Sequence, residues 1–106
     1  MGKLQEGFVH TVFFWLKEND NSGHKQLLLK GLSELSQISE IKDAYIGAPA
    51  GTRREVIDST FCWSITFIFE SAEDQDIYQT HPDHLKFIEN YGHLWSRVQV
   101  YDAFGR

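Results

Sequence analysis

The chain has 106 residues, of which 42% are hydrophobic and 14% aromatic, as expected for one globular domain with a single core rather than a disordered chain. Its net charge of −5 argues against a nucleic-acid surface, which needs clustered lysine and arginine. A single cysteine, Cys62, excludes an internal disulfide. No apolar run reaches membrane-spanning length and no signal peptide precedes the first predicted strand, so we expect a soluble, cytoplasmic protein that binds neither nucleic acid nor membrane.

Residues 7–16 are rich in β-branched and aromatic side chains and predict a first strand. After a polar turn, apolar residues recur every three or four positions and predict a helix that buries Leu28, Leu32, Leu35 and Ile38. Residues 41–48 predict a second strand that ends in a glycine- and proline-containing turn. The polar residues 52–59 then predict a loop.

Residues 60–70 predict a third strand with five large apolar side chains on one face: Phe61, Trp63, Ile65, Phe67 and Phe69. A helix follows, because the Ser71 hydroxyl can cap the amide three residues later and acidic residues fill the first turn.

Pro82 interrupts this helical stretch, since proline lacks an N–H and clashes with the preceding turn. We therefore expect one helix to end near Thr80 and a second to begin with Pro82 at its first position. The second helix and the turn after it are expected to bury four apolar side chains, those of Leu85, Ile88, Tyr91 and either Leu94 or Trp95. Residues 97–104 predict a short last strand.

The order strand, helix, strand, strand, helix, strand predicts an α+β, ferredoxin-like βαββαβ fold in one domain spanning residues 1–106. Its four-stranded antiparallel sheet would carry the helices on one face. The first and third strands are largely apolar on both faces, and an uncovered second face would expose a large aromatic patch. We therefore expect a homodimer in which the open sheet faces of two copies pack together.

The break at Pro82 brings Tyr78, His81 and His84 close together. His84 is the candidate general base, because an imidazole titrates near neutral pH. Tyr78 is the candidate catalytic hydrogen-bond donor to a developing oxyanion, and His10 could orient the polar end of an apolar ligand.

We expect this ligand pocket to be lined by His10, Phe8, Val12 and Trp63. The histidines and Tyr78 could instead have structural roles. His81 could cap a helix, and His10 could be a hydrogen-bonded histidine of the dimer core. Tyr78 and His84 could form a hydrogen bond with each other.

A metal site is not predicted. His81 and His84 are three residues apart, whereas helical ligand pairs usually stand four apart and need a third ligand. No glycine-rich phosphate loop follows a strand, so we do not predict a nucleotide. His10 or His84 could serve as an axial ligand of haem, but nothing in the sequence selects for it, and we expect no cofactor.

Two segments, residues 10–17 (HTVFFWLK) and residues 67–71 (FIFES), precede the motif Tyr78-x-x-His81-Pro82-x-His84. Together they resemble the stress-responsive A/B barrel domain (Dabb) family, over nearly the whole chain as far as Asp102. The resemblance implies a dimeric α+β barrel, and most members of the family have no assigned activity.

A plant member of the family closes a linear polyketide by aldol chemistry without a cofactor. The resemblance places its catalytic tyrosine and histidine at Tyr78 and His84, and a pocket histidine of its first strand at His10. A further pocket histidine in its third strand is replaced here by Trp63.

Three functions follow as hypotheses. The first is a Dabb-type homodimer of unassigned activity that binds a small hydrophobic ligand between sheet and helices. The second is a cofactor-independent, polyketide cyclase-like enzyme in which His84 abstracts a proton with the help of Tyr78. A monooxygenase-like α+β barrel is a third hypothesis, which depends on fold analogy alone.

Overall fold

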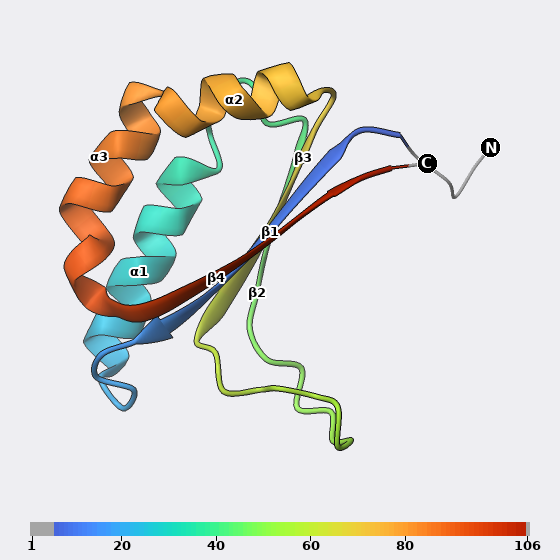
Figure 1. The fold of residues 1–106 in the computed structure, drawn as a ribbon. Coiled ribbons are helices and arrows are strands. Elements are labelled where there is room, and N and C mark those ends of the chain that lie inside the picture. Colours follow the sequence, from blue (N-terminus) through green and yellow to red (C-terminus); the bar gives the residue numbers. More distant parts are fainter. Residues whose placement is uncertain (1–5, 106) are drawn as a thin grey trace.

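The computed structural model describes residues 6–105. In chain order the elements are β1 (Phe8–Leu16), α1 (Ser22–Leu35), β2 (Asp43–Gly47), β3 (Trp63–Phe69), α2 (Ala72–Thr80), α3 (Pro82–Tyr91), the 3₁₀ turn η1 (Gly92–Leu94) and β4 (Trp95–Phe104). The strands form one antiparallel sheet in the order β2-β3-β1-β4, and the helices cover one of its faces (Figure 1). This is the ferredoxin-like fold that the sequence predicts. No helix in this part of the chain is long and apolar enough to cross a membrane.

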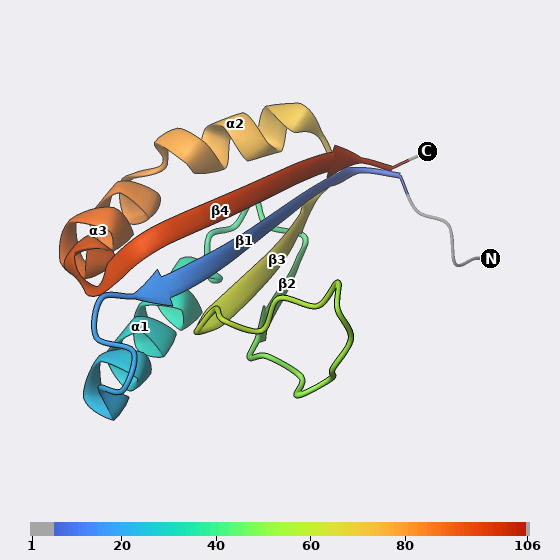
Figure 2. The ribbon, with the colours of Figure 1, turned by 60° about the horizontal axis from the view of Figure 1, so that its bottom comes forward.

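The strand register divides the side chains between two faces of the sheet. On the helix-covered face, His10 of β1 lies between its partners Phe67 on β3 and Asp102 on β4. On the opposite face, which we call the open face, Phe13 lies between Ser64 and Gln99. The two faces alternate along each strand because successive side chains of a strand point in opposite directions. Figure 2 shows the open face with no helix on it.

Apolar side chains fill the space between the sheet and the helices. The predicted buried set of α1 is confirmed, with Leu28, Leu32, Leu35 and Ile38 all at most 4% exposed, although Ile38 lies just beyond the end of the helix. This layer forms the core of the domain and fixes the position of the helices over β1 and β3.

The break between α2 and α3 follows the predicted pattern. The Ser71 hydroxyl accepts a hydrogen bond from the amide of Asp74 at 3.1 Å and caps α2. Helix α2 ends at Thr80, and α3 begins with Pro82 at its first position. The residue between them, His81, has extended backbone angles (φ −61°, ψ 137°) and therefore changes the direction of the chain.

Two predictions about α3 are wrong. Leu85 and Ile88 are 55% and 46% exposed, whereas Phe87 and Tyr91 are only 6% and 8% exposed. The change of direction at His81 fixes how α3 is rotated about its axis, and it turns the face with Phe87 and Tyr91 toward the sheet and α1. Leu94, the alternative to Trp95, is 1% exposed.

The predicted position of Phe61 is also wrong. It packs against Phe13 of the open face, with ring centroids 4.9 Å apart, rather than continuing the face of Trp63, Ile65 and Phe67. Strand β3 begins only at Trp63, so Phe61 precedes the regular alternation of the strand. The loop between β2 and β3, which carries Phe61, extends away from the helices (Figure 1).

Candidate functional site

A cavity of about 150 Å³ lies between the helix-covered face, α2 and α3. Four polar side chains line it: His10 from β1, Tyr78 and Gln79 from α2, and His84 from α3. The remaining walls are apolar and include Val12, Phe14, Ile65, Phe87, Trp95 and Val100. The site is thus a small apolar space with a polar group of residues in its wall, as is usual for ligand pockets.

The helix break positions the two residues predicted to be catalytic. Tyr78 lies in the last turn of α2 and His84 in the first turn of α3. Their ring centroids are 4.7 Å apart with an angle of 58° between the planes. A continuous helix would not hold two side chains six residues apart on one face so closely, because residues on one face recur after three or four positions.

His81 caps a helix, as one interpretation of the sequence predicts. Its Nδ1 accepts a hydrogen bond from the amide of Asp83 at 3.0 Å and caps the N-terminus of α3. It does not line the cavity. The capping interpretation of His81 is therefore confirmed.

His10 is held from the opposite side by the last strand. The residue is 5% exposed, and its Nδ1 lies 2.6 Å from Oδ1 of Asp102 on β4. The His10 ring lies 5.6 Å from the Tyr78 ring, centroid to centroid. Tyr78 therefore lies between the two histidines, in contact with both rings.

Burial shifts the pKa values of Tyr78 and His84 in opposite directions. Burial, and to a smaller extent the negative charge of Asp102, raises the pKa of Tyr78 well above its ordinary value, so the phenol stays protonated. Burial lowers the pKa of His84, the neighbouring imidazoles of His10 and His81 act in the same direction, and the backbone carbonyl of Gln79 opposes them. At neutral pH the pair is thus a neutral phenol beside a neutral imidazole.

The Nδ1 atom of His84 is buried and has no hydrogen-bond partner within residues 6–105. The rings of Tyr78 and His84 are in contact. Nδ1 of His84 does not form the hydrogen bond with Tyr78 that was one interpretation of this pair. A buried polar atom without a partner is unfavourable by about 1–3 kcal/mol. A ligand that bonds to this atom would remove that penalty.

The structure places four of the predicted site residues around the cavity: His10, Val12, Tyr78 and His84.

The other two, Phe8 and Trp63, lie outside it. The indole of Trp63 donates a hydrogen bond to the backbone carbonyl of Lys25 on α1 at 2.9 Å. Phe8 packs against Phe69 and Phe104, with centroid distances of 6.3 and 5.5 Å.

Sequence reasoning missed Asp102 and Gln79. The signal for Asp102 was present, because antiparallel pairing of the first and last strands places it directly opposite His10. No comparable signal pointed to Gln79, which lies in the last turn of α2 and lines the cavity.

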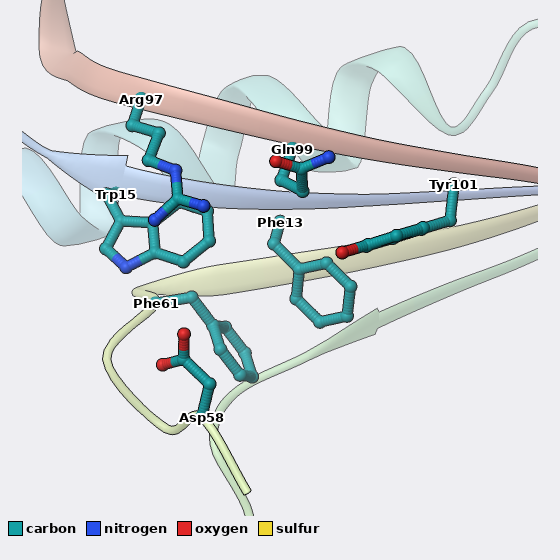
Figure 3. A pocket seen from close by; sticks show the side chains of 7 residues that line it. All are labelled: Phe13, Trp15, Asp58, Phe61, Arg97, Gln99 and Tyr101. Atoms are coloured by element: carbon teal, nitrogen blue, oxygen red, sulfur yellow. The ribbon is translucent and has the colours of Figure 1, made fainter. Parts of the chain in front are cut away.

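The open face carries a second pocket, of about 220 Å³ (Figure 3). Aromatic rings of Phe13, Trp15, Phe61 and Tyr101 line it, and the guanidinium of Arg97 lies 4.2 Å above the centroid of the Trp15 ring. Oδ1 of its acidic member, Asp58, accepts hydrogen bonds from the amide and hydroxyl of Thr60 at 2.9 and 2.6 Å. Aromatic rings therefore make up most of the lining of this pocket.

No cluster of three or more His, Cys, Asp or Glu side chains within residues 6–105 could hold a metal ion. The helix-side cavity itself offers two imidazoles, a phenol and an amide.

Comparisons with known proteins identify similar folds. A crystal structure of a Dabb family protein with a ferredoxin-like fold from Mesorhizobium loti is 22% identical, with a TM-score of 0.76, over 93% of this chain and 96% of that one. A hydroxynitrile lyase from Passiflora edulis is 20% identical, with a TM-score of 0.77 and 93% of each chain covered. A dimeric ferredoxin-like protein of unknown function from Thermobifida fusca is 19% identical, with a TM-score of 0.74, over 93% of this chain and 91% of that one.

No curated protein sequence matches the chain. The family model for the stress responsive A/B barrel domain, Dabb, matches residues 8–104, from the first residue of β1 to the last of β4. The match covers every strand and helix of the fold, and so the chain belongs to the stress-responsive A/B barrel (Dabb) domain family.

Proposed function

We propose that the protein binds a small, mostly apolar molecule in the cavity between the sheet and the helices, with the polar end of that molecule beside His10, Tyr78 and His84. The observation that carries the proposal is the buried, unpartnered Nδ1 of His84, a residue that lines this mostly apolar cavity. An engineered cavity of about 150 Å³ in another protein binds benzene, so the volume here suits a ligand with a single ring.

The test is a titration with single-ring molecules that carry one polar substituent, followed by the NMR signals of the His84 and Tyr78 rings. A Val100→Phe variant should abolish binding, because Val100 lines the cavity and is 44% exposed, so that a larger side chain can be accommodated at its edge. Val56→Phe is the matched control, since Val56 lies in the β2–β3 loop and is 82% exposed. Equal binding by both variants would place the ligand elsewhere and contradict the proposal.

A second candidate function is cofactor-independent proton transfer, in which His84 takes an acidic proton and Tyr78 donates a hydrogen bond to the oxygen that gains charge. The opposite pKa shifts favour it, because they keep the imidazole able to accept a proton and the phenol able to donate one. A structural neighbour, the Passiflora edulis protein, is a hydroxynitrile lyase, so this fold can support an enzyme.

Proton transfer is tested by following hydrogen–deuterium exchange at the α-carbon of cyclohexanone in D₂O by NMR. We expect the wild-type protein to accelerate exchange, and His84→Phe and Tyr78→Phe each to reduce the acceleration by about 10²-fold or more. Exchange that proceeds at the same rate with and without protein would leave only the binding function.

We further propose that two copies associate through the open face. The similar Thermobifida fusca protein is described as dimeric, and the exposed rings of Tyr45 and Tyr101 extend the aromatic surface around the open-face pocket. Sedimentation should give twice the 12.3 kDa mass of the chain. Phe13→Asp should give the single-chain mass, whereas Val56→Asp in the exposed loop should leave the mass unchanged.

A further inference from the structure

We propose that Asp102 is a positioning residue that fixes His10 with Nε2 as its free nitrogen, so that the cavity selects ligands whose polar end donates a hydrogen bond. This inference rests on the proposed binding function and adds the chemical class of ligand. It concerns the side of the cavity formed by β1 and β4, opposite the Tyr78 and His84 pair.

The geometry of the pair supports an orienting role. The His10 side chain is 7% exposed and that of Asp102 is 42% exposed, so Asp102 reaches a buried imidazole from the accessible edge strand. The separation of 2.6 Å between Nδ1 and Oδ1 is short for a nitrogen–oxygen hydrogen bond. Because the two residues are direct cross-strand partners, the sheet itself fixes their separation.

The chemistry of the two groups then determines where the proton lies. An ionised carboxylate can only accept hydrogen bonds, so the contact requires a proton on Nδ1 of His10. A neutral imidazole carries only one N–H, and Nε2 is therefore left with a lone pair. The same arrangement of carboxylate and histidine fixes the tautomer in hydrolase triads and around metal ions.

No other polar group that lines the cavity has a carboxylate partner among residues 6–105 to fix where its proton lies. The Tyr78 hydroxyl stays protonated and can donate. His84 has an unpartnered Nδ1 and no carboxylate partner among the described residues, so no carboxylate fixes its tautomer. The imidazole of His81, which does not line the cavity, is occupied in capping α3.

A ligand without a hydrogen-bond donor would cover Nε2 of His10 and leave it unpaired. The penalty for a buried unpaired acceptor discriminates more strongly than the gain from a hydrogen bond. Ligands with a hydroxyl group at the polar end should therefore bind more tightly than the same ligands in which the hydroxyl is methylated.

The tautomer is measured directly by long-range ¹H–¹⁵N correlation NMR of the histidine rings, at about pH 8, above the ordinary titration range of histidine. The expected result for the wild-type protein is a protonated Nδ1 and an unprotonated Nε2 on His10. Asp102→Leu should convert His10 to the Nε2-protonated tautomer that free histidine prefers. Asp76→Leu, which removes an exposed carboxylate from α2, is the matched control and should leave the His10 signals unchanged.

The ligand class is measured by titrating phenol and its methyl ether, anisole, into the same three proteins. The wild-type protein and Asp76→Leu should bind phenol at least about fivefold more tightly than anisole. In Asp102→Leu this ratio should fall to about one, while anisole binding stays within about twofold of wild type.

The outcomes separate this inference from the proposed function. An Nε2-protonated or doubly protonated His10 in the wild-type protein overturns the role of Asp102, whatever binds. Equal affinity for phenol and anisole in the wild-type protein overturns the ligand class but leaves ligand binding intact. If neither probe perturbs the His84 and Tyr78 signals, both the binding function and the ligand class fail, and the tautomer result alone decides whether Asp102 orients His10. If Asp102→Leu does not fold, the same measurements are made on Asp102→Val, because valine suits a strand position.

Discussion

The two faces of the sheet are built from the same strands and are similarly rich in aromatic residues, yet they differ in how their polar groups are satisfied. On the open face, the carboxylate of Asp58 accepts two hydrogen bonds from Thr60, and Arg97 stacks on the ring of Trp15. On the helix-covered face, Nδ1 of His84 is buried without a partner. Aromatic content therefore does not distinguish the two faces, whereas the unsatisfied buried group makes the helix-covered face the better candidate for a binding site.

The faces also differ in what closes them. Three helices cover one face, and the cavity that remains there is the smaller of the two, at about 150 Å³. The other face is closed by nothing within residues 6–105 and holds a pocket of about 220 Å³ (Figure 3). The larger pocket is thus the one lined mainly by aromatic rings. We expect the stability of the helix-covered face to depend on the fold of one chain, and that of the open face to depend on the association of two chains.

The strongest test of this difference compares two phenylalanines of neighbouring strands. Phe67 of β3 is fully buried on the helix-covered face and contacts the Tyr78 ring, with a centroid distance of 5.9 Å. Phe67→Ala should lower the free energy of unfolding by about 3–5 kcal/mol at any protein concentration. Urea unfolding at several protein concentrations measures this loss.

Phe13→Ala on the open face should behave differently. Its partners Phe61 and Tyr101 lie on the same uncovered surface, so the loss should be small in dilute protein and should grow with concentration as the dimer contributes more stability. If Phe13→Ala lost as much stability as Phe67→Ala in dilute solution, the open face would belong to the core of a single chain, and the distinction between the faces would fail.

A smaller effect is expected where α1 and α3 close the covered face. Gly31 of α1 faces the ring of Tyr91, and a Cβ atom added there would lie only 2.7 Å from Cδ2 of that ring. The Tyr91 hydroxyl also donates a hydrogen bond to Glu34 at 2.8 Å, which restrains the ring. Gly31→Ala should therefore destabilise the fold by about 1–2 kcal/mol, despite the better helix propensity of alanine.

Gly92→Ala provides the control for Gly31→Ala, because its added Cβ would find the nearest side-chain atom at 3.6 Å, an ordinary contact distance. Thermal unfolding of the two variants should separate them. A combined Gly31→Ala and Tyr91→Ala variant should lose less than the sum of the single changes, and a strictly additive loss would show that the overlap is not the cause.

Local signals in the sequence were sufficient to predict the fold and the part of the candidate site that lies at the helix break. Ser71 and Pro82 specify where the two helices begin, so the meeting of Tyr78 and His84 could be predicted. The rotation of α3 could not, because it follows from the backbone angles of His81, which turn Phe87 rather than Leu85 toward the core, and the spacing of apolar residues does not report those angles. Trp63 likewise has a strand position that predicts a side chain on the pocket side, but its indole donates a hydrogen bond to the backbone of α1 instead.

The smallest expected effect concerns pH and again separates the two faces. The folded-state pKa of His84 lies below its ordinary value of 6.5, so the unfolded chain binds more protons than the folded chain in the window below that value. The free energy of unfolding should therefore fall as pH decreases below about 6.5, and His84 should contribute no pH dependence well above it.

A His84→Phe variant, which cannot titrate at this position, should lose stability less steeply than wild type between about pH 6.5 and pH 5.

On the open face, the hydrogen bonds from Thr60 lower the pKa of Asp58. The stabilisation by the ionised Asp58 is therefore present above about pH 3.8 and is lost as pH falls below that value. Asp58→Asn should accordingly match wild type in slope near pH 6 and differ only in stronger acid. Urea unfolding across this pH range measures both variants. Parallel wild-type and His84→Phe curves above pH 5 would mean that His84 titrates alike in the folded and unfolded chains, and its burial would then have no electrostatic consequence.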